Sequence, residues 1–366
     1  RGVVLAGDRE QALDALTALA TDQEHPALVR GTAAPTPRIA YLFTGQGSQR
    51  PQMGHTLYTT HPAFATALNN TCDALDPHLE HPLRDIMFAP PDTPNAALLN
   101  ETRYTQPALF ALETALHHLL AHHGITPHYL TGHSIGELTA AHLAGILTLP
   151  DAALLITTRA HLMQTAPPGG AMTAIQATEE QIQPYLNNHV ALAAINSPTS
   201  LVISGDKDAI HHTTHTLKQH GHRTHPLTVS HAFHSHHMDP ILNQFHQTAQ
   251  TITYHQPHTP LITNGNPTTP HHWTNQIRNT VRHHDNITTL TTKNITTHLE
   301  LGPDATLTTH TPHTTPLLRK NHNENHTYQT ALATTHTQGT PTKPPTTHTH
   351  HHTNLPTYPF QPTHYW

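Results

Sequence analysis

Apolar and polar positions along this chain follow two patterns, one typical of buried strands and one typical of helices with a single apolar face. The apolar runs 38–43 and 125–130 predict buried strands, and the first of them ends in the glycine-rich turn 44–49. Helical spacing of apolar residues follows at 62–75, 106–123, 137–145 and 150–164. Strands that alternate with helices in this way indicate an α/β fold whose core is a parallel sheet.

The pattern of apolar and polar residues changes between residues 170 and 229, where short strand patterns dominate. Four strands are predicted at 171–176, 190–195, 201–204 and 222–229. Two helices are predicted among them at 178–186 and 206–220, the first capped by Thr178 and the second closed by Gly221. The resulting order, β-α-β-β-α-β, is that of a ferredoxin-like unit, and its position indicates a subdomain inserted into the larger fold.

Alternation of helices and strands returns after the insertion. The predicted helices and strands of this part lie at 238–251, 261–263, 273–281 and 298–302. We therefore assign residues 37–169 and 230–335 to one large α/β subdomain and residues 170–229 to the ferredoxin-like subdomain.

The two ends of the chain differ from its centre. Residues 1–36 contain an amphipathic helix pattern at 10–20 with Asp8 as its N-cap, and we interpret them as a preceding linker region. Residues 336–366 are rich in Thr, Pro and His and predict an extended C-terminal linker. The aromatic residues within 355–366 are expected to anchor this linker to the surface, so that it folds back on the domain.

Composition narrows the classes of function. With 366 residues, 35% of them apolar, the chain is long enough to bury a sizeable core. A formal net charge of −6, with few Lys and Arg, argues against a nucleic-acid partner. The single cysteine, Cys72, excludes an intrachain disulfide and a thiolate metal centre. No apolar run reaches the roughly 18 residues of a membrane helix and no leader pattern is recognised, so no membrane partner and a cytoplasmic location are expected.

Histidine is unusually frequent, with 42 residues, and clusters at 211–212, 236–237 and 348–352 raise the question of a metal site. The excess runs through predicted helices, loops and the C-terminal linker alike. The clusters lack the spaced, mixed ligand sets that close the coordination sphere of zinc. We therefore predict no metal site.

The segment 129–137 contains a strong catalytic signal, a Gly-His-Ser-Ile-Gly sequence between a predicted strand and a predicted helix. Gly132 and Gly136 flank Ser134 at a sharp turn, where larger side chains would collide with the neighbouring backbone. The helix that begins there directs free N–H groups toward an oxyanion formed on Ser134, which is therefore predicted to be a nucleophile. His133 is expected to pack beside the turn and to point away from the face that Ser134 presents.

A serine nucleophile requires a base, and histidine is the usual choice because its pKa lies near neutrality. The segment 230–239 contains several histidines and follows the last strand of the insertion, where the chain re-enters the large subdomain. We place the base in this segment. Asp206 and Asp208 lie between Ser134 and this segment, in the Ser-Asp-His order of α/β-hydrolases, but they are expected to cap the helix 206–220.

A set of short motifs runs through nearly the whole chain. They are FTGQGSQ at 43–49, YTQPALF at 104–110, GHSIGE at 132–137, GGAM at 169–172, NSP at 196–198, VISG at 202–205, HAFH at 231–234, LELGP at 299–303 and LPTYPF at 355–360. Together they resemble the acyltransferase domains of modular type I polyketide synthases, which are relatives of the malonyl-CoA:acyl-carrier-protein transacylases. The resemblance implies an α/β-hydrolase-like core with a parallel sheet and an inserted ferredoxin-like subdomain.

The resemblance also implies a role for each matching residue. Ser134 corresponds to the nucleophile and His234 to its general base, which a backbone carbonyl orients; we assign that carbonyl to Gln276. Gln46 and the backbone N–H of Ile135 correspond to the oxyanion hole.

Two further features of the family concern the acyl group. Arg159 corresponds to the arginine that pairs with the free carboxylate of the acyl unit, and a bidentate guanidinium would reject uncharged groups such as acetyl. His231 and Phe233 belong to the HAFH motif that accompanies malonyl selectivity, whereas YASH accompanies methylmalonyl selectivity, and Ile135 indicates the same preference. Phe233 is bulky enough to occupy the space of an α-methyl group, an effect worth about 1–3 kcal/mol.

The implied function is transfer of a malonyl unit from malonyl-CoA to the phosphopantetheine thiol of an acyl carrier protein through a malonyl-serine intermediate, with no bound cofactor. The implied partners are the acyl carrier protein, a neighbouring ketosynthase and other domains of the same polypeptide. Three alternatives remain open. They are a serine hydrolase or thioesterase that uses Ser134, His234 and an aspartate, a methylmalonyl-selective acyltransferase, and an inactive structural module of a megasynthase.

Overall fold

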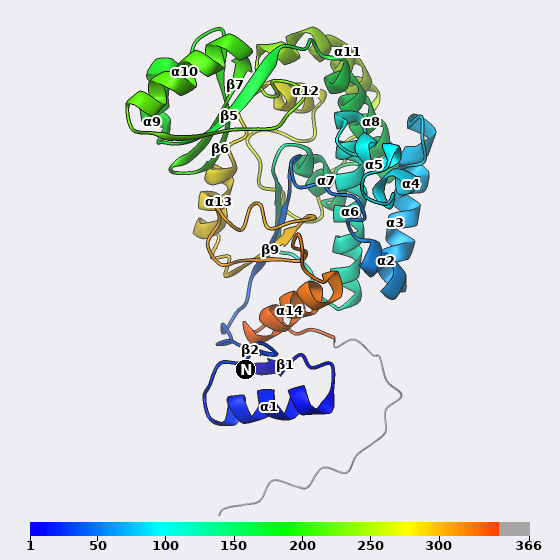
Figure 1. The fold of residues 1–366 in the computed structure, drawn as a ribbon. Coiled ribbons are helices and arrows are strands. Elements are labelled where there is room, and N and C mark those ends of the chain that lie inside the picture. Colours follow the sequence, from blue (N-terminus) through cyan, green and yellow to red (C-terminus); the bar gives the residue numbers. More distant parts are fainter. Residues whose placement is uncertain (344–366) are drawn as a thin grey trace, which may run out of the picture.

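The computed structural model describes residues 1–343. The predicted aromatic anchor at 355–366 lies outside the described residues. Figure 1 shows three parts in a row: a small N-terminal unit at one end, the large α/β part in the centre, and a second sheet with its two helices at the other end.

A four-stranded parallel sheet forms the centre of the large part. Its strand order is β10 (Thr314–Pro316), β9 (Thr297–Leu301), β3 (Ile39–Phe43) and β4 (Tyr129–Gly132). All three pairings are parallel, which confirms the predicted α/β class. The predicted strand at 261–263 is reduced to one bridge between Leu130 and Leu261, because the carbonyl of Ile262 accepts from the side chain of Thr131 and not from a backbone N–H of β4.

Helices pack on both faces of this sheet because successive residues of β3 point to opposite sides. Tyr41 and Phe43 belong to the main core, together with residues of the long helices, whereas Leu42 packs with Leu290 on the other side. The helices and the 3-10 turn that precede the insertion are α2 (His55–Thr60), α3 (Pro62–Leu75), η1 (Asp76–His78), α4 (Leu83–Met87), α5 (Pro94–Leu98), α6 (Thr102–His122), α7 (Ile135–Leu143) and α8 (Leu149–Thr165).

The second sheet is antiparallel, with the order β6-β7-β5-β8. Its elements in chain order are β5 (Gly170–Gln176), α9 (Glu179–Ile182), η2 (Gln183–Tyr185), β6 (Val190–Ser197), β7 (Ser200–Asp206), α10 (Lys207–Gln219) and β8 (Arg223–Pro226). This is the predicted β-α-β-β-α-β arrangement. The first helix ends earlier than predicted and continues as a 3-10 turn because Pro184 cannot donate the next helical hydrogen bond.

After the insertion the chain returns to the large part. The elements of this segment, apart from β9 and β10, are η3 (His236–Met238), α11 (Asp239–Thr251), α12 (Pro270–Arg278), α13 (His283–Thr292) and α14 (Glu324–Thr337). Helix α12 ends three residues before the predicted position, and Asn279, which follows it, has an extended backbone. Its carbonyl therefore lies outside the helical hydrogen-bond ladder, and this becomes important at the active site.

The N-terminal unit consists of β1 (Gly2–Val4), α1 (Arg9–Ala20) and β2 (Leu28–Arg30). Asp8 caps α1 as predicted, since its carboxylate accepts the N–H of Gln11 at 2.8 Å. The unit contacts α14, and Arg1 donates to the carbonyl of His336. Among the helices of residues 1–343, none combines the length and the apolar character needed to cross a bilayer.

Candidate active site

The predicted nucleophile stands at a sharp turn between β4 and α7. Ser134 has φ 52° and ψ −111°, a conformation that costs a residue with a side chain about 1–3 kcal/mol. A Cβ atom on Gly132 would lie 2.1 Å from the carbonyl carbon of Gly136, and one on Gly136 would lie 2.4 Å from the carbonyl oxygen of Phe43. Both glycines are therefore required for the turn, as the sequence predicts.

The structure brings Ser134 and His234 together although 100 residues separate them. Nε2 of His234 lies 2.9 Å from Oγ of Ser134, and Nδ1 lies 2.9 Å from the backbone carbonyl of Asn279. The carbonyl can only accept, so Nδ1 carries the proton and Nε2 has a free lone pair for the serine proton. Burial lowers the pKa of His234 to about 3, with a further contribution from the nearby positive charge of Arg159. The ring is therefore neutral at pH 7, the state that a base requires.

The orienting carbonyl is the one correction within the predicted base assembly. Asn279 makes the hydrogen bond to His234 that the sequence analysis assigned to Gln276, because α12 ends at Arg278 and leaves the next carbonyl free. The carbonyl of Gln276 raises the pKa of His234 less than that of Asn279 does. The sequence analysis thus placed the orienting carbonyl three residues before the residue that provides it.

Arg159 is a buried cation whose hydrogen bonds all go to neutral oxygens. Its side chain is on α8 and the residue is 1% exposed. It donates to Oε1 of Gln106 at 2.5 Å, to Oγ of Ser134 at 3.1 Å and to Oε1 of Gln276 at 3.2 Å. Its Nε has no partner within residues 1–343. Burial lowers the pKa of Arg159 to about 10, partly offset by the nearby charge of Glu137, so it remains charged. Glu137 makes no direct ion pair with Arg159 among the described residues, and an anionic ligand beside Ser134 would supply one.

Two further predicted residues lie at the same pocket as Ser134. Gln46 follows β3 and its amide exchanges hydrogen bonds with Oγ1 of Thr102 at 3.0 and 3.3 Å. Ile135 is the first residue of α7, and its backbone N–H has no acceptor among the described residues. An N–H group free at a helix N-terminus is suited to bind a developing oxyanion.

The pocket has a volume of about 840 Å³ and lies between the two sheets. One side consists of Gln46, Ser134 and Arg159 from the large part, and the other side consists of apolar residues of the second sheet, namely Met172, Ala174, Ala193, Ala194 and Val202. Phe233 lines the pocket and is 6% exposed. A small acyl group attached to Ser134 would therefore be enclosed mainly by apolar walls.

His231, which the sequence analysis assigned to acyl selectivity, does not line the pocket itself. It is buried behind Phe233, with ring centroids 6.0 Å apart, and its Nδ1 lies 2.8 Å from Oγ of Ser230. His231 therefore supports the wall that Phe233 forms. His133 was expected to point away from the face that Ser134 presents, but it lines the pocket. Its Nε2 lies 2.9 Å from Oδ1 of Asn196.

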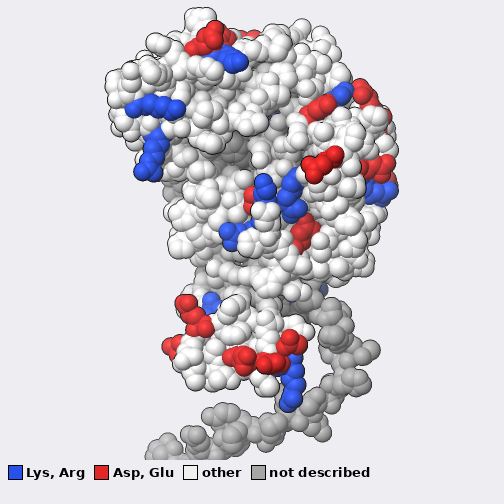
Figure 2. Space-filling model, in the orientation of Figure 1, with Lys and Arg blue, Asp and Glu red and all other residues white. Residues whose placement is uncertain are grey.

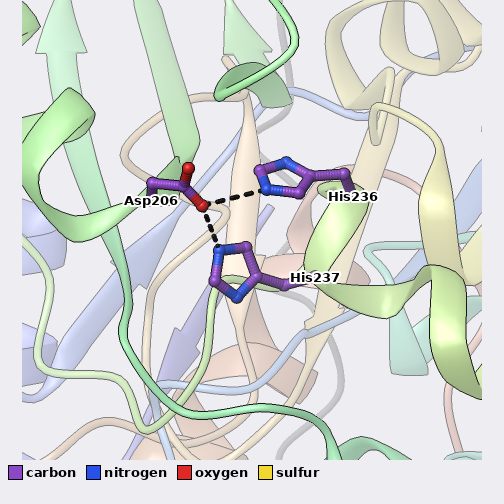
Figure 3. A group of neighbouring side chains, drawn as sticks. All are labelled: Asp206, His236 and His237. Atoms are coloured by element: carbon purple, nitrogen blue, oxygen red, sulfur yellow. Dashed lines mark hydrogen bonds and ion pairs between the residues drawn. The ribbon is translucent and has the colours of Figure 1, made fainter.

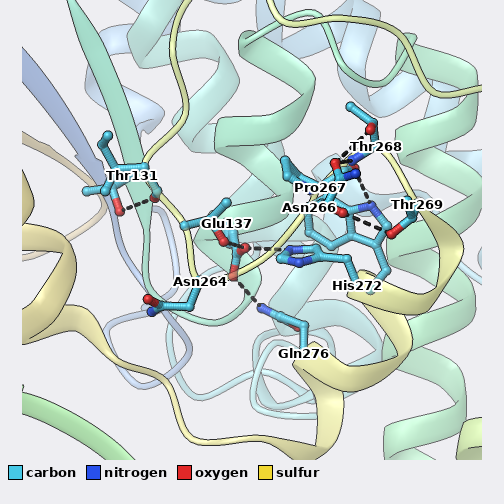
Figure 4. A network of polar contacts seen from close by, with 12 residues as sticks. Thr131, Glu137, Asn264, Asn266, Pro267, Thr268, Thr269, His272 and Gln276 are labelled. Atoms are coloured by element: carbon cyan, nitrogen blue, oxygen red, sulfur yellow. Dashed lines mark hydrogen bonds and ion pairs between the residues drawn. The ribbon is translucent and has the colours of Figure 1, made fainter.

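A polar network behind the turn includes residues to which the sequence analysis gave no role. Figure 4 shows Glu137, His272 and Gln276 close together. Glu137 accepts from Thr263 and from His272, the latter at 2.8 Å, and Nε2 of Gln276 donates to the carbonyl of Ser134 at 2.7 Å. Gln276 thus connects α12 to the turn and to Arg159. Gln106 lies in the YTQPALF motif and Glu137 in the GHSIGE motif, so their motif membership could have indicated a role for them.

Neither predicted aspartate cap supplies a third catalytic acid. Asp206 occupies the N-cap position of α10, as predicted, but its side chain makes no capping hydrogen bond. Its carboxylate accepts from three histidines instead. The ring of His234 is bonded to Ser134 and to the Asn279 carbonyl, so this pair lacks the acidic partner of a serine-hydrolase triad among the described residues.

Comparison with known proteins adds independent observations. A family model described as an acyl transferase domain matches residues 40–342. The spectinabilin polyketide synthase system protein NorB of Streptomyces orinoci is 45% identical over 319 residues, which cover 84% of this chain and 15% of that protein. The chain thus spans a small fraction of the length of this curated relative.

Two solved structures are similar over most of the chain. The acyltransferase domain from the second module of the salinomycin polyketide synthase has a TM-score of 0.89 and 39% identity, and the match covers 94% of this chain and 84% of that one. The malonyl-CoA:acyl carrier protein transacylase of Xanthomonas oryzae pv. oryzae has a TM-score of 0.70 and 28% identity, with 78% and 96% covered.

Proposed function

Because this chain belongs to the acyl transferase domain family, in the form found in modular polyketide synthases, and is an acyltransferase, we propose that it transfers a malonyl unit from malonyl-CoA to an acyl carrier protein. The observation that carries the choice of substrate is Arg159. It is a buried guanidinium without an acidic partner among the described residues, 3.1 Å from the oxygen that would hold the acyl group. A malonyl group on Ser134 carries a free carboxylate that would pair with it.

The first half-reaction follows from the Ser134–His234 geometry. Oγ of Ser134 attacks the thioester carbonyl of malonyl-CoA while its proton passes to Nε2 of His234. The negative charge on the carbonyl oxygen is stabilised by the N–H of Ile135 and the amide of Gln46. The intermediate then collapses, the C–S bond breaks, and coenzyme A leaves with the proton from His234.

The second half-reaction uses the same groups in reverse. The phosphopantetheine thiol of the carrier protein gives its proton to His234 and attacks the malonyl ester. The C–O bond breaks, and Ser134 recovers a proton from His234. This scheme needs no bound cofactor, since malonyl-CoA and the phosphopantetheine arm both act as substrates.

Arg159 also affects the base. In the free domain its positive charge lowers the pKa of His234. A malonyl carboxylate paired with Arg159 would cancel much of that repulsion and raise the proton affinity of His234 at the moment when it must accept a proton. An uncharged acyl group would leave the repulsion in place, so the arginine would favour dicarboxylic acyl units in binding and in chemistry.

Preference for malonyl over methylmalonyl rests on the apolar wall. Phe233 lines the pocket with Ser134 and Ile135, and His231 packs behind it. This supported ring would occupy the space needed by an α-methyl group. The acyl carrier protein and a neighbouring ketosynthase are the proposed partners, because the relatives are polyketide synthases far longer than this chain.

The test is competition among acyl-CoA esters. The domain is exposed to equal amounts of malonyl-, methylmalonyl- and acetyl-CoA, and the adduct on Ser134 is identified by mass spectrometry. We expect a malonyl adduct in the wild type, none in Ser134→Ala, and malonyl loading slower on the order of 100-fold in Arg159→Ala. Equal loading of acetyl and malonyl groups, or a loading rate indifferent to Arg159→Ala, would instead favour a hydrolase or thioesterase of neutral esters.

A further inference from the structure

A second cluster of ionisable side chains lies outside the pocket, where the second sheet meets the segment that carries the catalytic histidine. Asp206 ends β7, and His236 and His237 form most of the turn η3. One ligand atom from each lies within 4.8 Å of the others. Figure 3 shows both imidazole rings directed at the same carboxylate oxygen of Asp206.

The distances define a compact donor set. Oδ1 of Asp206 lies 2.9 Å from Nε2 of His236 and 2.7 Å from Nε2 of His237. The other oxygen, Oδ2, lies 2.7 Å from Nδ1 of His189. Two imidazole nitrogens and one carboxylate oxygen form a ligand set that suits Zn²⁺ and leaves a fourth position for water.

The observed spacing is close to what a metal ion requires. Ligands at about 2.0–2.2 Å from a tetrahedral zinc ion lie about 3.4 Å from one another, so the two Asp206–His pairs, at 2.9 and 2.7 Å, would each open by roughly half an ångström or slightly more. Side-chain exposure is 39% for Asp206, 30% for His236 and 10% for His237, which leaves room for this shift and a path for the ion. Each histidine would carry its proton on Nδ1 when Nε2 binds the metal.

The carboxylate is already prepared for this role. Its Oδ1 faces Nε2 of both His236 and His237, and an ionised carboxylate is the form that binds a metal ion. The bond from His189 fixes the orientation of the carboxylate and would act on the metal through it. Sequence spacing did not reveal the site because Asp206 lies 30 residues before the histidine pair.

We propose that Asp206, His236 and His237 bind one divalent transition-metal ion of the Zn²⁺ type, which joins the second sheet to the segment 231–238. That segment contains Phe233 and His234, which lie three and two residues before His236, the first of the two histidine ligands. The ion would therefore hold the base and the selectivity wall against the inserted subdomain. This proposal differs from the sequence analysis, which predicted no metal site.

The test is a Zn²⁺ titration of the full chain by calorimetry, with three variants of the proposed site and one control variant. We expect the wild type to bind one more ion than Asp206→Asn and His236→Ala at the same protein concentration. His189→Ala is expected to bind that ion at least about tenfold more weakly, since it removes only the orienting partner. The double variant His211→Ala, His212→Ala, on the exposed side of α10, is the control and is expected to bind as the wild type does.

The histidines at 348–352 are present in every variant, so any binding to them cancels in the comparison. A second readout is hydrogen exchange of residues 231–238, which Zn²⁺ is expected to slow in the wild type and not in Asp206→Asn. Circular dichroism tests whether Asp206→Asn is folded. If it is not, the variant His236→Ala, at a partly exposed position, decides. Equal stoichiometry in the wild type and the folded variant, or an equal loss in the control, would show adventitious binding and overturn the proposal.

Discussion

At the scale of single residues, the placement of Ser134 and His234 depends on backbone conformation as much as on side-chain identity. Ser134 and His234 both have positive φ, at 52° and 56°. Residues with a side chain adopt this region only when the surrounding structure holds them there, at a cost of about 1–3 kcal/mol. The strain directs Oγ of Ser134 and Nε2 of His234 toward each other at 2.9 Å.

Replacement of the base gives the first prediction. His234→Ala is expected to slow malonyl loading of Ser134 by about 10²–10⁴-fold, because general-base assistance is lost while the oxyanion donors remain. Quenched-flow mass spectrometry of the adduct measures this rate. His231→Ala is the comparison and is expected to retain most of the rate, since its ring lies behind Phe233. A wild-type rate in His234→Ala would remove this histidine from the mechanism.

The pH dependence of loading follows from the lowered pKa of His234. A base must be neutral, and a pKa lowered from 6.5 to about 3 keeps the ring neutral as the pH falls below 6.5. We therefore expect kcat/KM for loading to stay nearly constant between pH 7.5 and 5.5 in brief pH-jump assays. An acidic limb with its midpoint at the ordinary histidine value would show that the ring is solvated in the free domain.

Acyl selectivity gives a prediction for the pocket wall. Phe233→Ser combined with His231→Tyr is expected to raise methylmalonyl loading relative to malonyl by about tenfold, since one methyl group is worth about 1–3 kcal/mol and Ile135 also lines the pocket. The ratio of the two adducts on Ser134 measures the change directly. The steric explanation fails if the wild type already loads both groups equally, or if the ratio is unchanged while loading stays fast.

At the scale of elements, the ends of strands and helices decide where the functional atoms lie. The turn from β4 into α7 presents Ser134, and the end of α12 at Arg278 frees the carbonyl of Asn279 for His234. Gln276 on α12 bonds the carbonyl of Ser134 and also accepts from Arg159. Helix α12 and the residue that follows it therefore connect Ser134, His234 and Arg159.

The closeness of α7 to β3 yields a prediction for Gly136. Gly136→Ala places a methyl group 2.4 Å from the carbonyl oxygen of Phe43, and neither backbone can move without disturbing the turn. We expect a loss of unfolding free energy of about 1–3 kcal/mol or more together with loss of loading. Urea denaturation measures the first and the Ser134 adduct the second. Gly7→Ala is the matched control, because its nearest contact is the end of the Gln11 side chain at 3.8 Å.

At the scale of the whole molecule, the pocket exists because the second sheet packs over the turn of the large part. Neither part encloses the acyl site alone, since the polar groups and the apolar wall come from opposite sides. Figure 2 shows that Lys, Arg, Asp and Glu are sparse over wide areas of the surface. Only 11% of the residues are Lys, Arg, Asp or Glu, whereas the chain contains 42 histidines. The net charge of −6 therefore holds only while the histidines are neutral, and it becomes more positive as they gain protons.

Buried histidines make the folded state sensitive to acid. Burial lowers the pKa of His117 and of His234 to about 3 and that of His283 well below 6.5. Such rings stay neutral in the native state while the unfolded chain binds protons, so each costs about 1.4 kcal/mol of stability per pH unit as the pH falls below 6.5. Burial raises the pKa of Glu113 to about 8 and acts with the opposite sign.

His117 offers a direct test of this balance. Its Nδ1 is buried without a partner among the described residues, and its ring packs against Tyr41. His117→Leu is expected to flatten the decline of unfolding free energy between pH 6.5 and 5 by up to about 1.4 kcal/mol per pH unit. Urea denaturation at several pH values measures the slope. His212→Leu, on an exposed position of α10, is expected to leave the slope unchanged.

Local chemistry in the sequence was sufficient for the fold class and for the sharp turn at Ser134. Gly132 and Gly136 predict the turn at Ser134 because only glycine fits there, and the apolar run 38–43 predicts a strand buried on both faces. The predicted order of elements in the insertion was also confirmed. These features depend on residues close together in the chain, whose steric and solvation requirements are present in the local pattern.

Tertiary structure alone decided which groups meet across the chain. The exact end of α12 determined that Asn279 orients His234 in place of Gln276, and the packing of Phe233 placed His231 behind the pocket wall. Asp206 was predicted to cap a helix with its side chain, but its carboxylate is hydrogen-bonded to His236 and His237, about 30 residues later in the chain. Such contacts depend on the relative placement of elements to within an ångström, which is set by packing between them and not by periodicity within any one of them.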